Sequence, residues 1–145
     1  MEDFIRAAKV DENALIPTRK HPEDAGMDFY ACEDKCIPPH GVDIVRTGVT
    51  IEIPRGYVGL LRLKSRSDYL LGAGVVDAGY QGEILIKIFN PLDKDLKIAA
   101  GQAIAQLLLL PVWCPAVEAV PLSEIHQVAS ARGATGGIVT QKYSE

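Results

Sequence analysis

The sequence has little cysteine and no excess of positive charge. Three cysteines occur among its 145 residues, Cys32, Cys36 and Cys114. This odd and sparse count does not fit a disulfide framework, so we expect a reducing, cytoplasmic location. Asp and Glu number 19 against 15 Lys and Arg, which gives a net charge of −4. Because proteins that bind the phosphate backbone of nucleic acids carry a basic excess, we expect no nucleic-acid partner.

Long hydrophobic runs are also missing. The longest run, residues 107–113, is interrupted by Pro111, and it is far shorter than the roughly 20 residues that a membrane-spanning helix needs. The first residues lack the basic start and the apolar stretch of a signal peptide. The sequence therefore predicts neither a membrane partner nor secretion.

One possible metal site can be drawn from Cys32, Cys36 and His40, which follow one another at intervals of four residues. This spacing is not a common zinc pattern, and no fourth ligand is obvious. We therefore favour small side chains in a strand-and-turn region over a metal site.

Glycine and proline punctuate the whole sequence. The 13 Gly and 9 Pro residues are spread along the chain, and between them apolar and polar residues alternate with a period of two, as in Val42–Ile53 and Glu83–Phe89. Residues 103–110 are apolar nearly throughout, which predicts a strand buried on both faces. Helical periodicity is weak, although residues 67–71 could form one helical turn. The pattern predicts an all-β fold: a sandwich, a jelly roll or a barrel of short strands.

The length supports one domain. We expect that domain to occupy residues 1–128. Residues 129–145 are small, polar and rich in glycine, so we expect them to form a flexible tail that buries too little surface to order itself.

Five short segments are more polar, or richer in glycine, than a plain turn requires: 25–31, 64–69, 72–82, 101–107 and 132–137. Asp28 interrupts an apolar strand pattern, where a carboxylate is costly unless it meets a cation or hydrogen-bond donors. Arg66 and Ser67 offer a cation and a hydroxyl that suit phosphate oxygens. Taken singly, each segment also has a structural explanation, such as a turn cap or a solvated charge. Their order and spacing together favour a ligand site.

The third segment is the most informative. Its glycines allow the backbone to approach a ligand closely, and it carries one carboxylate, Asp77, and one aromatic residue, Tyr80. In the fourth segment, Gln106 interrupts an otherwise buried run. These features predict a polar site built on a β scaffold.

In this order the five segments resemble the five motifs of the trimeric dUTP diphosphatases (dUTPases). The resemblance runs from about Ile16 to Thr140, and its most specific part is Gly-Val-Val-Asp-Ala-Gly-Tyr-Gln-Gly at residues 74–82. It implies a distorted β jelly roll that assembles as a homotrimer, with active sites between subunits. The implied reaction is Mg²⁺-dependent hydrolysis of dUTP to dUMP and pyrophosphate.

The resemblance also implies a role for individual residues. Asp77 would be the general base that activates the water attacking the α-phosphorus, and Tyr80 would lie against the deoxyribose. Asp28 would hold Mg²⁺ through bound water, since this ion dehydrates reluctantly. The remaining substrate-binding residues would be Arg66, Ser67, Gly74, Val75, Val76, Gln106, Arg132 and Gly133.

The sequence departs from the family pattern at several points. The connection between the second and third motifs, residues 68–71, is short, and Asp68 stands where a small residue is usual. Ala103 replaces a common basic residue, and Gly137 or Ile138 stands where the last motif has an aromatic ring. The resemblance implies that the tail of one subunit closes over a site on its neighbours. Because of these departures, we expect activity with a looser closure of the tail and a lower affinity.

Two alternatives remain open. The related dCTP deaminases share the fold, but the chemistry of that family needs a glutamate at the position of Lys87. The chain would otherwise be a nucleotide-binding relative that has lost turnover. Retention of Asp77 favours an enzyme, because a protein that only binds nucleotide has no need of that carboxylate.

Overall fold

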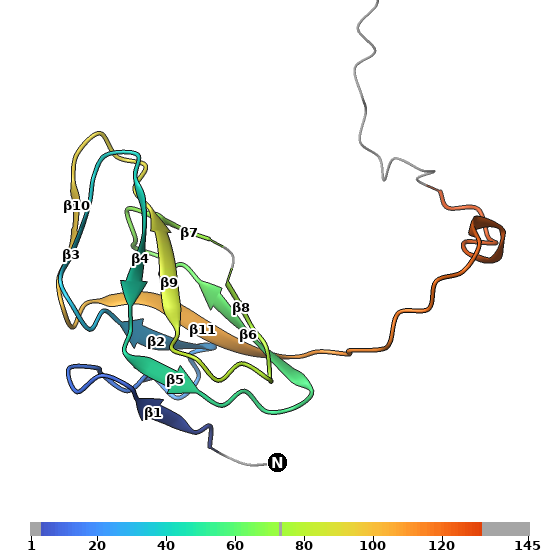
Figure 1. Ribbon diagram of the computed structural model, residues 1–145, viewed down its shortest axis with the longest axis horizontal. Helices are drawn as coiled ribbons and strands as arrows, with labels where there is room; N and C mark the ends of the chain where they lie inside the picture. Colours follow the sequence, from blue (N-terminus) through green and yellow to red (C-terminus); the bar gives the residue numbers. More distant parts are fainter. Residues whose placement is uncertain (1–3, 73, 132–145) are drawn as a thin grey trace, which may run out of the picture. The chain divides into compact units, whose positions relative to one another are not determined.

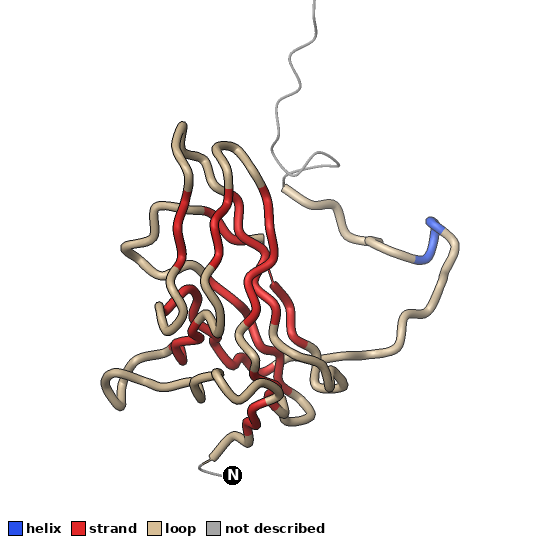
Figure 2. Tube along the Cα trace, turned by 60° about the vertical axis from the view of Figure 1, so that its left-hand side comes forward, coloured by secondary structure: helices blue, strands red, loops and turns tan. Residues whose placement is uncertain are grey.

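The structure is a computed structural model that describes residues 4–72 and 74–131 (Figure 1). These residues form eleven short strands and a single 3-10 helix, so the all-β prediction is confirmed. The strands are β1 (Ala7–Lys9), β2 (Gly26–Tyr30), β3 (Lys35–Ile37), β4 (Val42–Arg46), β5 (Val49–Ile51), β6 (Tyr57–Arg62), β7 (Leu70–Leu71), β8 (Gly74–Val76), β9 (Leu85–Phe89), β10 (Leu96–Ile98) and β11 (Ala103–Pro111). Loops of different lengths connect them, as Figure 2 shows.

The strands pair into antiparallel sheets. The largest has the order β2-β11-β6-β8, a second has the order β4-β9-β7, and two ribbons pair β1 with β5 and β10 with β3. In the view of Figure 1, β4 and β9 run across the direction of β11. Buried side chains from both larger sheets, such as Phe29, Leu107, Val45 and Ile88, contribute to one hydrophobic core.

The register of the largest sheet decides which side chains face away from the core. Leu107 of β11 lies opposite Met27 and Leu61, and all three are buried. The next position, Gln106, lies opposite Asp28 and Arg62. Because side chains alternate between the two faces of a sheet, these three polar residues share its outer face. A slip of one residue would bury them and expose the core set.

Three expectations about local structure were wrong in part. The run at 103–110 is not buried on both faces throughout, because Leu108 is only half-buried and Leu110 is 41% exposed on the outer face. The predicted strand Val42–Ile53 is divided into β4 and β5 at Gly48, whose φ of 67° favours glycine. Residues 67–71 form no helical turn, since a turn at 64–67 precedes the short strand β7.

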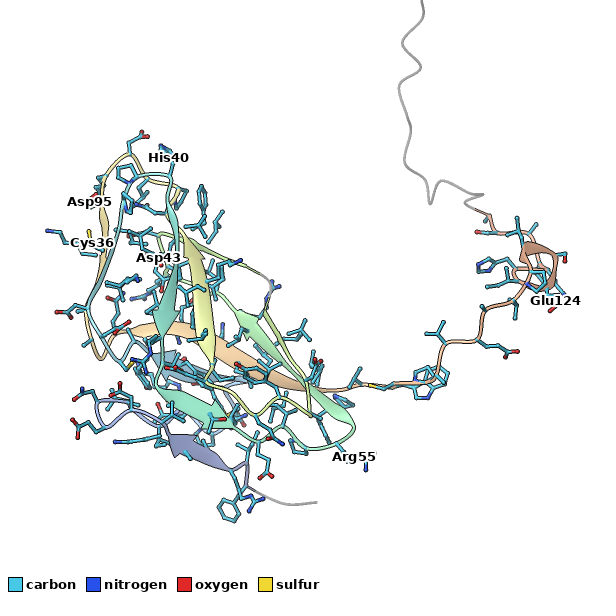
Figure 3. All side chains as sticks on the ribbon, viewed as in Figure 1. Cys36, His40, Asp43, Arg55, Asp95 and Glu124 are labelled. Carbon is cyan, nitrogen blue, oxygen red and sulfur yellow. The ribbon has the colours of Figure 1, made fainter. Side chains whose placement is uncertain are left out.

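The chain divides into two compact units, Met1–Cys114 and Pro115–Glu145. In the described part of the second unit, all residues from Pro115 to Ala131 are exposed, and Leu122–Glu124 form the 3-10 helix. Glu124 of this helix is labelled in Figure 3. Within the described residues, no helix is long and apolar enough to cross a membrane. The boundary at residue 128 and the flexibility of the tail stay predictions.

A buried asparagine ties the loop after β9 to neighbouring backbone. The Asn90 side-chain amide donates hydrogen bonds to the carbonyl oxygens of Ile37 (3.0 Å), Pro38 (3.1 Å) and Lys94 (2.8 Å). Its Oδ1 accepts from the Leu92 amide at 3.0 Å. Since buried polar groups left without partners are costly, this residue stabilises the junction between β9, β10 and β3.

Replacing Asn90 by alanine should therefore lower the free energy of unfolding by about 3 kcal/mol, because the change strands several polar groups in the interior. Urea denaturation of both proteins measures this difference. The matched control is Asp95→Ala on the exposed part of the same loop, which should stay within about 0.5 kcal/mol of the parent. A loss below about 1 kcal/mol for Asn90→Ala would contradict the structural role.

Candidate active site

Asp28 meets the cation that its place in an apolar strand requires. Its Oδ1 lies 2.5 Å from the Lys64 ammonium nitrogen, and its backbone pairs with Thr18 across an isolated bridge. The Asp28 side chain is 17% exposed and the Lys64 side chain 34% exposed. The pair therefore joins β2 to the chain that leaves β6, in a partly solvated position.

Gln106 lies opposite Asp28 on the neighbouring strand, and its side chain is held by a hydrogen bond on the same face of the sheet. Its Nε2 donates a hydrogen bond to the Leu63 carbonyl at 3.0 Å. A Cβ added at Gly26 would collide with the Gln106 side chain, whose Oε1 and Cβ lie nearest to it. Glycine at position 26 therefore makes room for the Gln106 side chain, and the first and fourth predicted motifs depend on each other sterically.

Arg66 and Ser67 lie on a tight turn directly after Lys64. The Ser67 amide donates to the Lys64 carbonyl at 3.1 Å, which closes the turn. The Arg66 side chain is exposed and Ser67 is half-buried. Both residues line a cleft of about 280 Å³ together with Lys64, Asp68 and Lys97, so cations predominate around it.

Tyr69 fixes the far end of this turn, and the sequence analysis did not single it out. Its hydroxyl donates to the Ile104 carbonyl at 2.9 Å. Ile104 lies at a break in the pairing of β11 with β2, between Ala103 and Ala105, where an irregular strand leaves backbone groups unpaired. Burial raises the pKa of the Tyr69 phenol. The only signal in the sequence was an aromatic ring inside a polar segment.

Tyr69→Phe should lower the free energy of unfolding by about 1.5 kcal/mol at pH 8, because the buried Ile104 carbonyl loses its donor. The difference should shrink above pH 10. In the folded parent protein the raised pKa keeps the Tyr69 phenol neutral there, whereas in the unfolded chain, with the ordinary tyrosine pKa of 10.0, the phenol releases its proton. The unfolded state is therefore favoured as pH rises, and the parent loses the stability that Tyr69 contributes.

Urea unfolding of both proteins between pH 8 and pH 11 measures the effect. All other titrating groups are common to the two proteins and cancel in the comparison. A difference that widens with rising pH would contradict the raised pKa of Tyr69.

Asp77 and Tyr80 lie on the tight turn that follows β8. The Tyr80 amide donates to the Asp77 carbonyl at 3.0 Å, and the Tyr80 hydroxyl donates to the Glu83 carbonyl at 2.6 Å. A Cβ at Gly82 would lie 2.5 Å from the Tyr80 hydroxyl oxygen, so a larger residue there would displace the Tyr80 side chain from this position. The Asp77 side chain is exposed, and the Tyr80 residue is 42% exposed. The turn thus presents a carboxylate and an aromatic ring to solvent on a fixed backbone.

Glu83 anchors the end of this turn to the body of the protein. Its carboxylate accepts the Gly48 amide at 2.7 Å and pairs with the Arg46 guanidinium at 3.2 Å. Arg46 also pairs with Asp11 at 3.3 Å. The hydrogen bond and charge of Glu83 raise the pKa of Arg46. None of these anchoring residues was predicted, since their partners lie more than thirty positions away in the sequence.

Within one chain, the predicted site residues other than β8 fall into two groups. Asp77 and Tyr80 lie on the turn after β8, whereas Asp28, Arg66, Ser67 and Gln106 lie near the end of β6. Val76, next to Asp77, pairs with Gly59 near the start of β6, whereas Lys64 follows the end of that strand. Five residues of extended chain span roughly 15 Å. Tyr80 and Arg66 accordingly line different clefts that share no residue.

The structure places the other predicted residues as follows. Gly74, Val75 and Val76 form β8, with Val76 buried and Val75 63% exposed on the outer face. Gly74 packs closely on Leu61, whose Cβ would lie 2.9 Å from an added Cβ. Arg132 and Gly133 lie outside the described residues.

The fold does not bring Cys32, Cys36 and His40 together into a metal site. Cys32 is buried, and this burial raises the pKa of its thiol, whereas Cys36 is exposed on β3. His40 turns to Asp93, with its Nε2 2.7 Å from the carboxylate, and Figure 3 shows it at the end of the loop beyond β3. Among the described residues, no group of three or more His, Cys, Asp or Glu side chains is arranged to hold a metal ion.

Comparison with known proteins shows the family to which the chain belongs. The family model named dUTPase matches residues 12–138. The deoxyuridine 5'-triphosphate nucleotidohydrolase of Clostridium tetani is 36% identical over 142 residues, covering 93% of this chain and 98% of the relative. That of Debaryomyces hansenii is 34% identical over 139 residues, covering 93% of this chain and 87% of the relative.

Solved structures show the same fold. A dUTPase of Staphylococcus bacteriophage 80alpha with dUpNHpp superposes with a TM-score of 0.83 at 27% identity, covering 95% of this chain and all of that one. A dUTPase from phage phi11 of S. aureus, described with a structural Mg(II) ion, gives a TM-score of 0.77 at 27% identity, covering 83% and 99%. The fold is a β jelly roll, as predicted, and the chain belongs to the dUTPase family.

Proposed function

We propose that this chain hydrolyses dUTP to dUMP and pyrophosphate, with Asp77 as the general base. Family membership supports the reaction. The observation that carries the proposal is the position of Asp77, an exposed carboxylate on a turn that the Tyr80 amide closes by a hydrogen bond to the Asp77 carbonyl. Cationic and polar side chains line a separate cleft.

In the proposed reaction, the Asp77 carboxylate takes a proton from a water molecule as the water oxygen attacks the α-phosphorus. A bond forms between that oxygen and the phosphorus, and the bond from the phosphorus to the oxygen bridging to the β-phosphate breaks. The electron pair leaves with pyrophosphate, and dUMP keeps the new oxygen.

Recognition of the nucleoside would use the turn and the strand before it. The Tyr80 hydroxyl donates a hydrogen bond to the Glu83 carbonyl, which fixes the direction of the ring. The ring would lie against the deoxyribose and leave no room for a 2′-hydroxyl. β8 is the outermost strand of its sheet. One backbone edge of Gly74–Val76 therefore faces away from the sheet and would provide the donors and acceptors that read the uracil edge.

The phosphate groups would bind at the other group of residues. Arg66 offers a guanidinium, and Ser67 a hydroxyl, on one turn. Gln106 uses one amide hydrogen on the Leu63 carbonyl and keeps a second for a phosphate oxygen. Hydrogen bonds from charged donors to phosphate are among the strong ones in proteins.

The residues present fit a hydrated Mg²⁺ ion. The Asp28 Oδ1 pairs with Lys64, whereas its Oδ2 has no hydrogen bond to any of the described residues. One carboxylate is enough for an ion that keeps most of its water and binds substrate phosphates. When bound, Mg²⁺ would neutralise charge on the triphosphate and fix its geometry. Asp28 is the residue that we propose to hold it through water.

A homotrimer would bring the two groups of residues together. In one chain they lie at opposite ends of β6, so a complete site needs a second copy. The outer face of the largest sheet carries apolar side chains, including Leu60, Val75, Leu108 and Leu110, that are half-buried or exposed in the single chain. Apolar surface of this kind marks a protein interface. We propose sites between subunits of a trimer.

The alternatives are less well supported. Lys87, an exposed residue of β9, supplies no carboxylate for deamination of dCTP. A non-catalytic binder would not need the exposed Asp77. The cytoplasmic location stays a prediction based on the sparse cysteine content.

Asp77→Asn should lower the turnover of dUTP by about 10² or more, because the amide cannot accept the proton. The affinity for dUpNHpp should change little, since the isosteric side chain removes no phosphate contact. Pyrophosphate release and calorimetric titration measure the two quantities. Asp95→Asn, at an exposed residue that lines neither of the two clefts, is the control. Unchanged turnover in Asp77→Asn would remove Asp77 from its role.

Two inactive variants should complement each other when they assemble together. In a mixed trimer of Asp77→Asn and Arg66→Ala chains, a site that takes its carboxylate from one chain and its guanidinium from another is intact. Random mixing at equal amounts should restore roughly a quarter of the parent sites. Activity of the co-expressed, co-purified proteins measures this, with Asp77→Asn mixed with Asp77→Ala as the control. No recovery would contradict a site shared between copies.

A further inference from the structure

Lys64 stands between the two parts of the predicted phosphate site, and the family resemblance assigns it no role. Its ammonium lies 2.5 Å from the Asp28 carboxylate, and the same side chain lines the cleft of Arg66 and Ser67. We propose that Lys64 binds the triphosphate of the nucleotide by changing partners. In the free protein it neutralises Asp28, and in the complex it donates to phosphate oxygens. This inference rests on the proposed function.

The surroundings of Lys64 allow the ammonium to move while its backbone stays in place. The Lys64 carbonyl accepts the Ser67 amide at 3.1 Å, and the preceding Leu63 carbonyl accepts the Gln106 side chain at 3.0 Å. The side chain is 34% exposed. Lysine has a flexible four-carbon stem and three donors, of which Asp28 uses one. The charge can therefore turn toward a ligand in the cleft without a change of fold.

The charges around the cleft explain why a change of partner would occur. Arg66, Lys97 and Asp68 also line it, and among the described residues none of these three takes part in an ion pair. Lys64 is thus the cation of the cleft that is already engaged. The Asp28 side chain is only 17% exposed, so its carboxylate needs a positive partner. Once hydrated Mg²⁺ supplies that charge, the Lys64 ammonium is free for phosphate.

Two opposite effects follow from this arrangement. Lys64 and Mg²⁺ compete for the same carboxylate in the free protein, so removing the ammonium should let the metal bind at least as tightly as before. The ammonium and the triphosphate attract each other in the complex, so removing it should weaken nucleotide binding. A purely structural ion pair would give a different result, because its loss would disturb Asp28 and weaken both.

Lys64→Met tests the inference by calorimetric titration with dUpNHpp in the presence of Mg²⁺, and with Mg²⁺ alone. The nucleotide affinity should fall by roughly tenfold or more, the usual effect of losing a charged hydrogen bond. The affinity for Mg²⁺ alone should stay equal or rise. Lys64→Arg should recover most of the nucleotide affinity. Lys94→Met, which removes the same charge from an exposed loop, should leave both affinities unchanged.

A nucleotide affinity for Lys64→Met within twofold of the parent would overturn the inference, and so would a loss of affinity for Mg²⁺ alone. If Lys64→Met does not fold, the double variant Asp28→Asn with Lys64→Met leaves no buried charge unpaired. Compared with Asp28→Asn alone, it should still bind dUpNHpp more weakly. An equal affinity of these two variants would also overturn the inference.

The parent protein separates this inference from the proposed function. If the parent neither binds dUpNHpp nor releases pyrophosphate from dUTP, the proposed function itself fails. If the parent does both and Lys64→Met binds dUpNHpp equally well, only the role of Lys64 fails.

Discussion

The pairing of β11 with a strand on each side is the constraint on which the rest of the structure depends. One register fixes both faces of the sheet at once, because side chains alternate along every strand. Leu107 and its cross-strand neighbours Met27 and Leu61 enter the core, and this requires Gln106 and Asp28 to lie on the opposite face. The hydrophobic core therefore determines where the polar site is built.

The two turns that carry chemistry are held by different means. The turn at 64–69 is fixed by a buried phenol, since Tyr69 donates to a backbone carbonyl at an irregularity in β11. The turn after β8 is fixed by the Tyr80 hydroxyl within the turn itself and by Glu83 beyond it. In both cases the groups proposed to contact substrate are exposed or half-buried while their backbone is restrained, which is how a site is prepared before its ligand arrives.

Much of this architecture could be predicted from local sequence patterns. Alternation of apolar residues indicated the strands, and Gln106 was singled out because it interrupts an apolar run. The resemblance of residues 74–82 to a family motif indicated the reaction. What could not be predicted depends on pairs far apart in the chain. The partner of Asp28 is thirty-six positions away, and the need for glycine at position 26 arises from a side chain on another strand.

The errors had a related physical cause. The apolar run in β11 was expected to be covered on both faces, but periodicity within one strand does not reveal whether a second layer lies over it. Leu110 and Val75 are in fact exposed in the single chain. The short segment 67–71 was compatible with a helical turn by composition, yet its last two residues, Leu70 and Leu71, pair with β9 as strand β7.

The exposed leucine and valine side chains on the outer face of the sheet also affect the newly synthesised chain. Until the assembly that we propose covers this surface, a folded single copy exposes it to contact with other proteins in a crowded solution. Whether the single copy assembles or aggregates then depends on the rate at which copies meet, and therefore on the concentration of the protein. The side chains that we propose to complete the assembly would, at low abundance, make the isolated subunit a target for chaperones and proteases.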